Sequence, residues 1–480
     1  MDTASLQFVG YGILAALICN FSRSVVWRGA VLLIASLIFI RLVFGGNPWR
    51  MLLPFAGFVA LGFVAIKLVE RGWSRGLVVA IVVIVSSYLW LKKYTFIPTG
   101  WLLPGAYFTM GLSYIFFRVL SLLVARSSPQ SREPLGLIRY LIYLLNFTTL
   151  VSGPIQPYEA FARDQFSANP PTLDAGIVAL QLERIVRGFF KVNVLAMLLF
   201  AFQEDALRDI SFPTSPVATP FNVFFAMVIY PLFLYANFSG YMDIVIGLAR
   251  LMRVVLPENF NRPFSAPSYI EFWNRWHITL SQWVKVHIYN PLLIALMRRT
   301  SLAGSEAMIG VFCFFVTFFL LGLWHGRTSE FLVFGLLQGG GVSANKLWQI
   351  AMAKLLGRKP YRQLTVKPLY IVAARGLTFS YFAFTLLWFW ANWRQIETVE
   401  QAISVPQWLT TWLAAWAVSS CVLAIWERLR EALLSLQFEG APLFAGRYAL
   451  VVYATVLGFV ALLVTVTLNQ PAPDVVYKAF

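Results

Sequence analysis

Two of the three histidines in this chain directly follow a tryptophan, within stretches that are otherwise mostly apolar. They are His277, which follows Trp276, and His325, which follows Trp324. An isolated polar ring is costly in an apolar medium, so each is a candidate functional residue. Burial favours the neutral imidazole near pH 7, the form that acts as a general base. Either ring could instead be structural, through a backbone hydrogen bond for His325 or through an interfacial aromatic belt for His277.

The charged residues near these motifs allow two interpretations. Asp243 lies in an apolar segment that also carries Arg250, and we expect it to be paired inside the protein or to line a cavity. A group of basic side chains could hold a phosphorylated donor at the cytoplasmic face, or could simply reflect the excess of positive charge in cytoplasmic loops. These residues are Arg262, Arg275, Lys285, Arg298 and Arg299.

Motifs for other kinds of chemistry are missing from the sequence. It has no Cys/His set with metal-ligand spacing, no glycine-rich phosphate loop and no G-x-S-x-G elbow. We therefore predict no metal site, no tightly bound cofactor and no covalent serine intermediate. The three cysteines lie inside apolar runs and are interpreted as small buried hydrophobic residues.

The elements that position the histidines are predicted to be membrane helices. The chain has 480 residues, of which 59% are hydrophobic and 12% charged, against roughly 25% charged in ordinary globular domains. Apolar runs of about 20 residues recur, and this length spans ~30 Å of hydrocarbon. We predict an all-α polytopic membrane protein with about 11–14 transmembrane or re-entrant helices, in one membrane-embedded domain over residues 1–480. The net charge of +17 fits loops that face anionic lipid, and no nucleic-acid partner is expected.

The predicted spans set the order and orientation of the chain. Residues 354–367 contain three basic residues between two flanking lysines and no acid, which predicts a cytoplasmic position. The span over residues 136–152 is expected to break at Gly153-Pro154. The spans are predicted at about 6–21, 29–44, 52–69, 76–91, 103–125, 136–152, 188–203, 219–237, 240–256, 306–324, 329–348, 371–392, 407–426 and 448–468.

The segment 258–300 is too polar for an ordinary span, yet it is rich in Trp, Phe and Leu. Ser268 and Glu271 form an S-x-x-E capping box, so a helix is predicted to begin there. The helical period predicts an interfacial or re-entrant helix with four residues on one face. They are Trp273, His277, Leu280 and Val284.

At this point the sequence resembles the membrane-bound O-acyltransferase family. The likeness is greatest to its bacterial branch of alginate O-acetylating and teichoic acid D-alanyl transfer proteins. Ordered blocks carry the resemblance over a motif-bearing core of about 105–345, and further C-terminal spans follow over 350–480. The blocks are Gly111 to Tyr114, Thr148 to Gln156, Gly188 to Lys191, Phe238 to Ile244 with Gly247 to Arg250, Glu258 to Phe264, Phe272 to Ser281 and Gly322 to Gly326.

The resemblance implies a ring of helices around a central funnel, where a cytoplasmic thioester meets an extracytoplasmic acceptor. It implies that His325 is the catalytic histidine and His277 a supporting one. An acyl thioester is already activated, so the protein needs a base for the acceptor hydroxyl and donors for the developing oxyanion. His277, Asn274 or a tryptophan could orient or stabilise. The further substrate-binding or supporting candidates are Trp276, Trp324, Arg275, Asp243, Asn261 and Ser281.

Some positions depart from the usual family pattern. Gln338 stands where many members have histidine, and Val284 to His287 replace an aromatic residue followed by Arg-Asp-Tyr. Asn274 is more similar to the D-alanyl branch. These departures concern the identity of donor and acceptor, while the reaction class stays the same.

We therefore predict a multi-pass O-acyltransferase of the bacterial cytoplasmic (inner) membrane. It would move acetyl from a cytoplasmic thioester, acetyl-CoA or an acyl carrier protein, to hydroxyls of a cell-surface polysaccharide or a carrier partner. A periplasmic or extracellular acetylesterase-like protein is a further expected partner. One alternative is transfer of D-alanyl or another acyl group from a carrier protein to a teichoic-acid-like polymer. From other classes, a proton-coupled transporter and a non-catalytic scaffold remain open.

Overall fold

The structure is a computed structural model. It describes residues 4–72, 76–127, 134–211, 218–299, 306–438, 441–442 and 447–468. Most of these residues are helical, and their only strands are β1 (Gln437–Phe438) and β2 (Ala441–Pro442), which pair antiparallel. The predicted all-α class is confirmed.

Seven helices in the described ranges are long and apolar enough to cross a membrane. Three shorter apolar helices of 10–17 residues accompany them. This pattern confirms a polytopic membrane protein, while the predicted number of spans stays a prediction. The seven cover Val25–Phe44, Trp49–Glu70, Ala175–Ser211, Thr219–Leu251, Glu306–Trp324, Pro368–Trp390 and Val405–Ser435.

The chain divides into two compact units. The first holds the described residues of Met1–Asn193, Asn237–Glu258 and Val460–Phe480, and the second holds those of Val194–Ala236 and Asn259–Phe459. Three helices pass from one unit to the other: the π-helix η3 (Lys191–Ala196), α11 (Ala218–Leu251) and α22 (Arg447–Leu468). The predicted funnel concerns the whole chain and stays a prediction.

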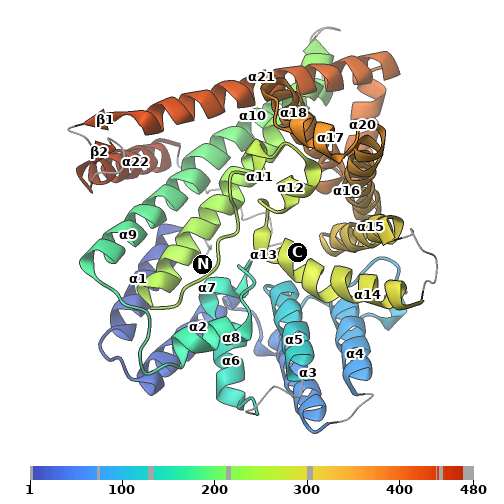
Figure 1. The fold of residues 1–480 in the computed structure, drawn as a ribbon. Helices are drawn as coiled ribbons and strands as arrows, with labels where there is room; N and C mark the ends of the chain where they lie inside the picture. The colour runs from blue at the N-terminus through green and yellow to red at the C-terminus, as the bar shows by residue number, and fades with distance from the viewer. Residues whose placement is uncertain are drawn as a thin grey trace. The chain divides into compact units, whose positions relative to one another are not determined.

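Within the first unit, α3, α4 and α5 lie side by side (Figure 1). Buried Arg118 of α5 donates to the carbonyls of Tyr143 and Leu144 at the end of α6 and to that of Thr149 in α7. These bonds stabilise a helix break. The elements of this unit are α1 (Leu6–Cys19), α2 (Val25–Phe44), η1 (Trp49–Leu52), α3 (Leu53–Glu70), α4 (Gly76–Leu91), η2 (Thr99–Trp101), α5 (Leu112–Arg126), α6 (Leu137–Leu145), α7 (Phe147–Leu150), α8 (Tyr158–Gln165) and α9 (Ala175–Phe190).

In the second unit, the long helix α21 lies along α18 (Figure 1). The helices α15 and α16 form a tight hairpin that bears His325 at its turn. The elements are α10 (Met197–Ser211), η4 (Pro263–Ser265), α12 (Tyr269–Trp273), α13 (Ile278–Val284), η5 (Lys285–Tyr289), α14 (Asn290–Arg299), α15 (Glu306–Trp324), α16 (Glu330–Leu355), α17 (Arg358–Thr365), α18 (Pro368–Thr385), α19 (Leu387–Trp390), α20 (Trp393–Ala402) and α21 (Val405–Ser435), with β1 and β2.

Two predicted span boundaries are wrong. The spans expected at 219–237 and 240–256 form one helix, α11, which continues through Gly240 and ends at Leu251. A Cβ at Gly240 would lie 2.8 Å from the carbonyl oxygen of Gly188, so this glycine allows close packing of α9 against α11. The span over 136–152 breaks before Gly153, at Asn146, whose side chain accepts from the Thr148 amide and caps α7.

Candidate active site

His325 follows the last residue of α15 and is 2% exposed. Its Nδ1 lies 2.7 Å from the carbonyl oxygen of Leu321. Because a carbonyl can only accept, Nδ1 carries the proton and Nε2 holds the lone pair. Nε2 is therefore the ring nitrogen that can take a proton from a hydroxyl group.

Aromatic side chains surround the His325 ring. The ring centroids of Trp324, Phe334 and Phe389 lie 4.7, 5.6 and 5.5 Å from that of His325. Burial among them disfavours the charged imidazolium and lowers the pKa of His325 to about 4. The ring is therefore neutral near pH 7, as a general base must be.

Glycines allow the hairpin that holds His325. A Cβ on Gly322 would lie 2.2 Å from the Cα of Gly335, and a Cβ on Gly335 would lie 2.7 Å from the carbonyl oxygen of Phe319. Real Cβ atoms essentially never approach so closely. The backbones of α15 and α16 therefore pack directly against each other, which fixes the residue that follows α15.

The single helix predicted around His277 is wrong. Ser268 Oγ does accept from the Glu271 amide at 3.2 Å, so the predicted helix start is confirmed. The helix ends at Trp273, however, and His277 adopts the left-handed region with φ 44° before α13 begins. Trp273, His277, Leu280 and Val284 therefore do not share the face of one helix.

Backbone pairing with an upstream segment explains this break. The Asn261 amide donates to the Arg275 carbonyl at 2.9 Å, and the Ile278 amide donates to the Asn259 carbonyl at 2.9 Å. Between these bonds, Phe260 and Trp276 form an antiparallel β-bridge. These hydrogen bonds take the place of helical ones and hold the chain in a turn at His277.

Asn259 is a site residue to which the sequence analysis gave no role. Its Oδ1 lies 3.2 Å from His277 Nδ1 and accepts from the amide and hydroxyl of Thr279 at 3.1 and 2.9 Å. Asn259 and His277 are both 0% exposed. Desolvation and the charge of His325 lower the pKa of His277 well below its usual value. The sequence signal that could have identified Asn259 is its position in the motif block Glu258 to Phe264.

The other predicted residues of this segment differ in burial. Trp276 is 1% exposed and packs against Phe260 with a centroid distance of 5.1 Å. Arg275 is ion-paired with Glu271, while Asn261 and Asn274 are exposed. Ser281 is partly buried, and its hydroxyl donates to the carbonyl of Trp276 at 3.3 Å. Trp276 and Ser281 therefore support the His277 turn.

Of the remaining predicted basic residues, Arg262 is ion-paired with Glu427. His287 Nδ1 lies 3.0 Å from the Trp283 carbonyl oxygen, and the two rings stack.

Asp243 belongs to the first unit and forms an ion network there. Its oxygens lie 3.0 Å from Arg184 Nε and 2.8 Å from Lys191 Nζ, and Arg187 Nε lies at 3.5 Å. Arg184 also pairs with Glu258 at 2.6 Å. The expected internal pairing is therefore present, with cations of α9 and η3 rather than with Arg250.

A large cavity of about 920 Å³ lies in the second unit, between α12, α16, α17 and α18. Tyr269 lines it, and its hydroxyl donates to Gln338, whose Nε2 donates to Thr385 Oγ1 at 2.9 Å. No sequence motif indicated this cavity, and part of its lining lies beyond the motif-bearing core that ends at about residue 345. Five aromatic residues line it, namely Tyr269, Trp348, Tyr361, Tyr370 and Tyr381.

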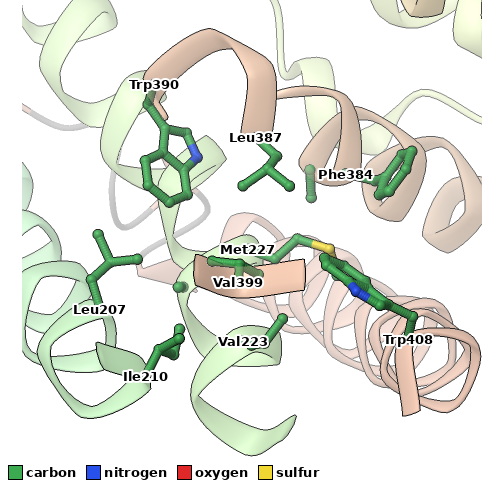
Figure 2. Close-up of a pocket in the computed structure, with 11 residues that line it drawn as sticks. Leu207, Ile210, Val223, Met227, Phe384, Leu387, Trp390, Val399 and Trp408 are labelled. Atoms are coloured by element: carbon green, nitrogen blue, oxygen red, sulfur yellow. The ribbon is translucent and has the colours of Figure 1, made fainter. Parts of the chain in front are cut away.

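A second cavity, shown in Figure 2, is apolar and much smaller. Leu207, Val223, Leu387 and Trp408 converge on it from four helices, and its volume is about 20 Å³. It has room for little more than one water molecule. It is therefore part of the core of the second unit rather than a substrate site.

The chain is similar in sequence to known proteins. A model of the membrane-bound O-acyltransferase family matches residues 76–383, a range that contains both histidines and the whole lining of the large cavity. A teichoic acid D-alanyltransferase of Bacillus subtilis (strain 168) is 27% identical over 227 residues, which cover 47% of this chain and 56% of that protein. Another, of Streptococcus thermophilus (strain ATCC BAA-250 / LMG 18311), is 29% identical over 249 residues, covering 50% and 57%.

A probable alginate O-acetylase of Pseudomonas fluorescens is 30% identical over 251 residues, covering 52% of this chain and 46% of that protein. The chain thus spans about half the length of these relatives.

Proposed function

Because this chain belongs to the membrane-bound O-acyltransferase family, we propose that it transfers an acetyl group from a cytoplasmic thioester to hydroxyls of an extracytoplasmic polysaccharide. The proposed location is the bacterial inner membrane. The observation that carries the proposal is the buried, neutral His325, whose Nε2 holds the lone pair. A base of this kind is what the acceptor hydroxyl requires.

The proposed reaction is a direct transfer. The acceptor oxygen attacks the thioester carbonyl carbon while His325 Nε2 takes its proton. The C–S bond then breaks, and the proton passes from the imidazolium to the departing sulfur, which leaves as a thiol. The oxygen ester is the product, and His325 is neutral again. A preorganised hydrogen-bond donor must stabilise the oxyanion that forms between the attack and the breaking of the C–S bond.

We propose that the large cavity receives the thioester donor. Tyr361 and Thr365 of α17 line it, and α17 also carries Arg358, Lys359 and Arg362. The excess of basic residues is typical of the cytoplasmic side. The aromatic walls and the volume of about 920 Å³ suit the nucleotide or pantetheine part of a donor.

The comparisons also support an alternative in which a different acyl group is transferred. Two of the relatives are named teichoic acid D-alanyltransferases, so the alternative donor is D-alanyl carried by a protein. An acetylesterase-like partner outside the membrane would accompany the acetyl reaction. A carrier protein and its ligase would accompany the D-alanyl reaction.

The test compares His325→Ala with His287→Ala in the full-length protein in vesicles. Acetyl-CoA and an acylated carrier protein, each with a labelled acyl group, are offered as separate donors, and label on the polysaccharide is measured. We expect His325→Ala to lose at least about 10²-fold in rate, because a positioned base contributes roughly 10²–10⁴-fold. His287→Ala should retain the rate at equal membrane insertion.

Full activity of His325→Ala would remove the catalytic assignment. Solute uptake without thioester consumption by the wild-type protein would overturn the enzyme proposal in favour of a transporter.

A further inference from the structure

We propose that Asn259 is a positioning residue that holds His277 with its proton on Nδ1, so that His277 acts through Nε2 as a hydrogen-bond acceptor. This inference rests on the proposed acyl transfer and assigns the role of the second histidine in it. It follows from three hydrogen bonds that meet at one oxygen atom.

The first step identifies that oxygen. The backbone amide of Thr279 lies 3.1 Å from Asn259 Oδ1, and a backbone N–H can only donate. The side-chain atom that faces it must therefore be the carboxamide oxygen and not the nitrogen. The hydroxyl of Thr279 lies 2.9 Å from the same atom, which agrees with this assignment. The orientation of the Asn259 carboxamide is thus fixed.

The second step identifies the tautomer of His277. Its Nδ1 lies 3.2 Å from the same Oδ1. An oxygen acceptor at this distance requires a proton on Nδ1, so Nε2 of the neutral ring holds the lone pair. His325 reaches the same tautomer through the Leu321 carbonyl, at 2.7 Å. Both histidines therefore have an accepting Nε2.

This tautomer limits what His277 can do. A neutral ring with the proton on Nδ1 cannot donate from Nε2 to an oxyanion, which excludes His277 as the oxyanion donor in its neutral form. It can accept a hydrogen bond from the acceptor hydroxyl and thereby orient it. A proton on His325 disfavours protonation of His277.

Asn259 fixes the backbone of His277 as well as its ring. The backbone carbonyl of Asn259 accepts from the amide of Ile278, the residue after His277. His277 itself adopts the left-handed backbone region. The Nδ2 of Asn259 has no hydrogen-bond partner among the residues that the structure describes. A buried amide of this kind is completed by water or by a substrate oxygen.

The first experiment needs no catalytic assay. ¹⁵N spectra of histidine-labelled, full-length protein in lipid nanodiscs report which ring nitrogen carries the proton, and His277→Asn assigns the signal. We expect wild-type His277 to carry its proton on Nδ1. A wild-type proton on Nε2 would overturn the proposal, whatever the enzyme is found to transfer.

The second experiment compares Asn259→Ala and Asn259→Asp. Asn259→Ala should populate the Nε2–H tautomer and reduce kcat on the order of 10²-fold, with little change in KM for the thioester. Asn259→Asp keeps an accepting oxygen and should retain Nδ1–H and recover much of kcat. The matched control is Asn392→Ala, because Asn392 Oδ1 also accepts a backbone amide, that of Gln395, but caps α20.

A wild-type kcat in a folded Asn259→Ala protein would overturn the proposal. If Asn259→Ala does not fold, Asn259→Asp decides the matter, since loss of Nδ1–H in that variant would overturn the proposal equally. Loss of transfer in every variant and in the wild type would count against the proposed function alone, because the tautomer is measured separately.

Discussion

His325 donates from Nδ1 to the carbonyl oxygen of Leu321, one helical turn earlier in α15, over 2.7 Å. The last turn of a helix leaves carbonyl groups without helical partners. His325 satisfies one of them and is held in a single tautomer by it. The position of the ring at the end of α15 therefore sets which nitrogen can act as a base.

The pH dependence of transfer follows from the burial of His325. Desolvation lowers its pKa to about 4, so the active neutral form persists as the pH falls through 6.5, where an ordinary histidine is half protonated. We expect kcat/KM to stay level from neutral pH to about pH 5 and to fall only near pH 4. Rates in vesicles across this range test it. A fall centred near pH 6.5 would contradict the buried base.

Gly322→Ala should destabilise the protein and reduce activity. The new Cβ would lie 2.2 Å from the Cα of Gly335, so α15 and α16 must separate, at a cost of about 1–3 kcal/mol or more. His325 would move with the end of α15. The measurement is Tm in detergent together with transfer rate. Gly310→Ala in the same helix is the control, because its nearest neighbour lies at 3.6 Å. Equal Tm values for both variants would contradict the packing argument.

Asp243→Asn should cost about 1.5–3 kcal/mol, because it removes the buried carboxylate that the partly exposed Arg184, Arg187 and Lys191 share. Thermal unfolding of the full-length protein measures the loss. Glu258→Gln is the matched control on the same Arg184. The Glu258 side chain is 59% exposed, so its ion pair contributes at most about 1 kcal/mol. A larger loss of stability from Glu258→Gln than from Asp243→Asn would contradict this ranking of the two ion pairs.

Gly340→Leu should weaken donor binding without unfolding the protein. Gly340 lines the large cavity, and a Cβ there would have no neighbour within 4 Å, so a leucine side chain would occupy donor space. We expect KM for the thioester to rise roughly tenfold, which corresponds to about 1.4 kcal/mol. KM for the polysaccharide should not change. Leu347→Phe is the control, since Leu347 is 40% exposed on the same helix and lies outside the lining. An unchanged KM for the thioester would contradict the proposal that the donor binds in this cavity.

The sequence alone predicted the family, the all-α membrane class and the reaction class, and the family match confirms them. These predictions succeeded because they depend on local signals. Hydrophobic runs of sufficient length specify spans, and Ser268 with Glu271 specifies a helix start within four residues. The Trp-His motifs were visible for the same reason, as polar rings in apolar sequence. Their catalytic roles stay predictions.

Only the tertiary structure decided how the two histidines are held. Helical periodicity predicted one helix through His277, but hydrogen bonds from residues 259–261 draw residues 275–278 out of it. Such pairing joins residues distant in sequence and leaves no mark in the local pattern. The same holds for the close packing of α11 against α9 at Gly240 and for the large cavity, which residues of four helices line together. Local residue types determine which elements form, whereas contacts between elements determine the proton positions and spaces on which chemistry depends.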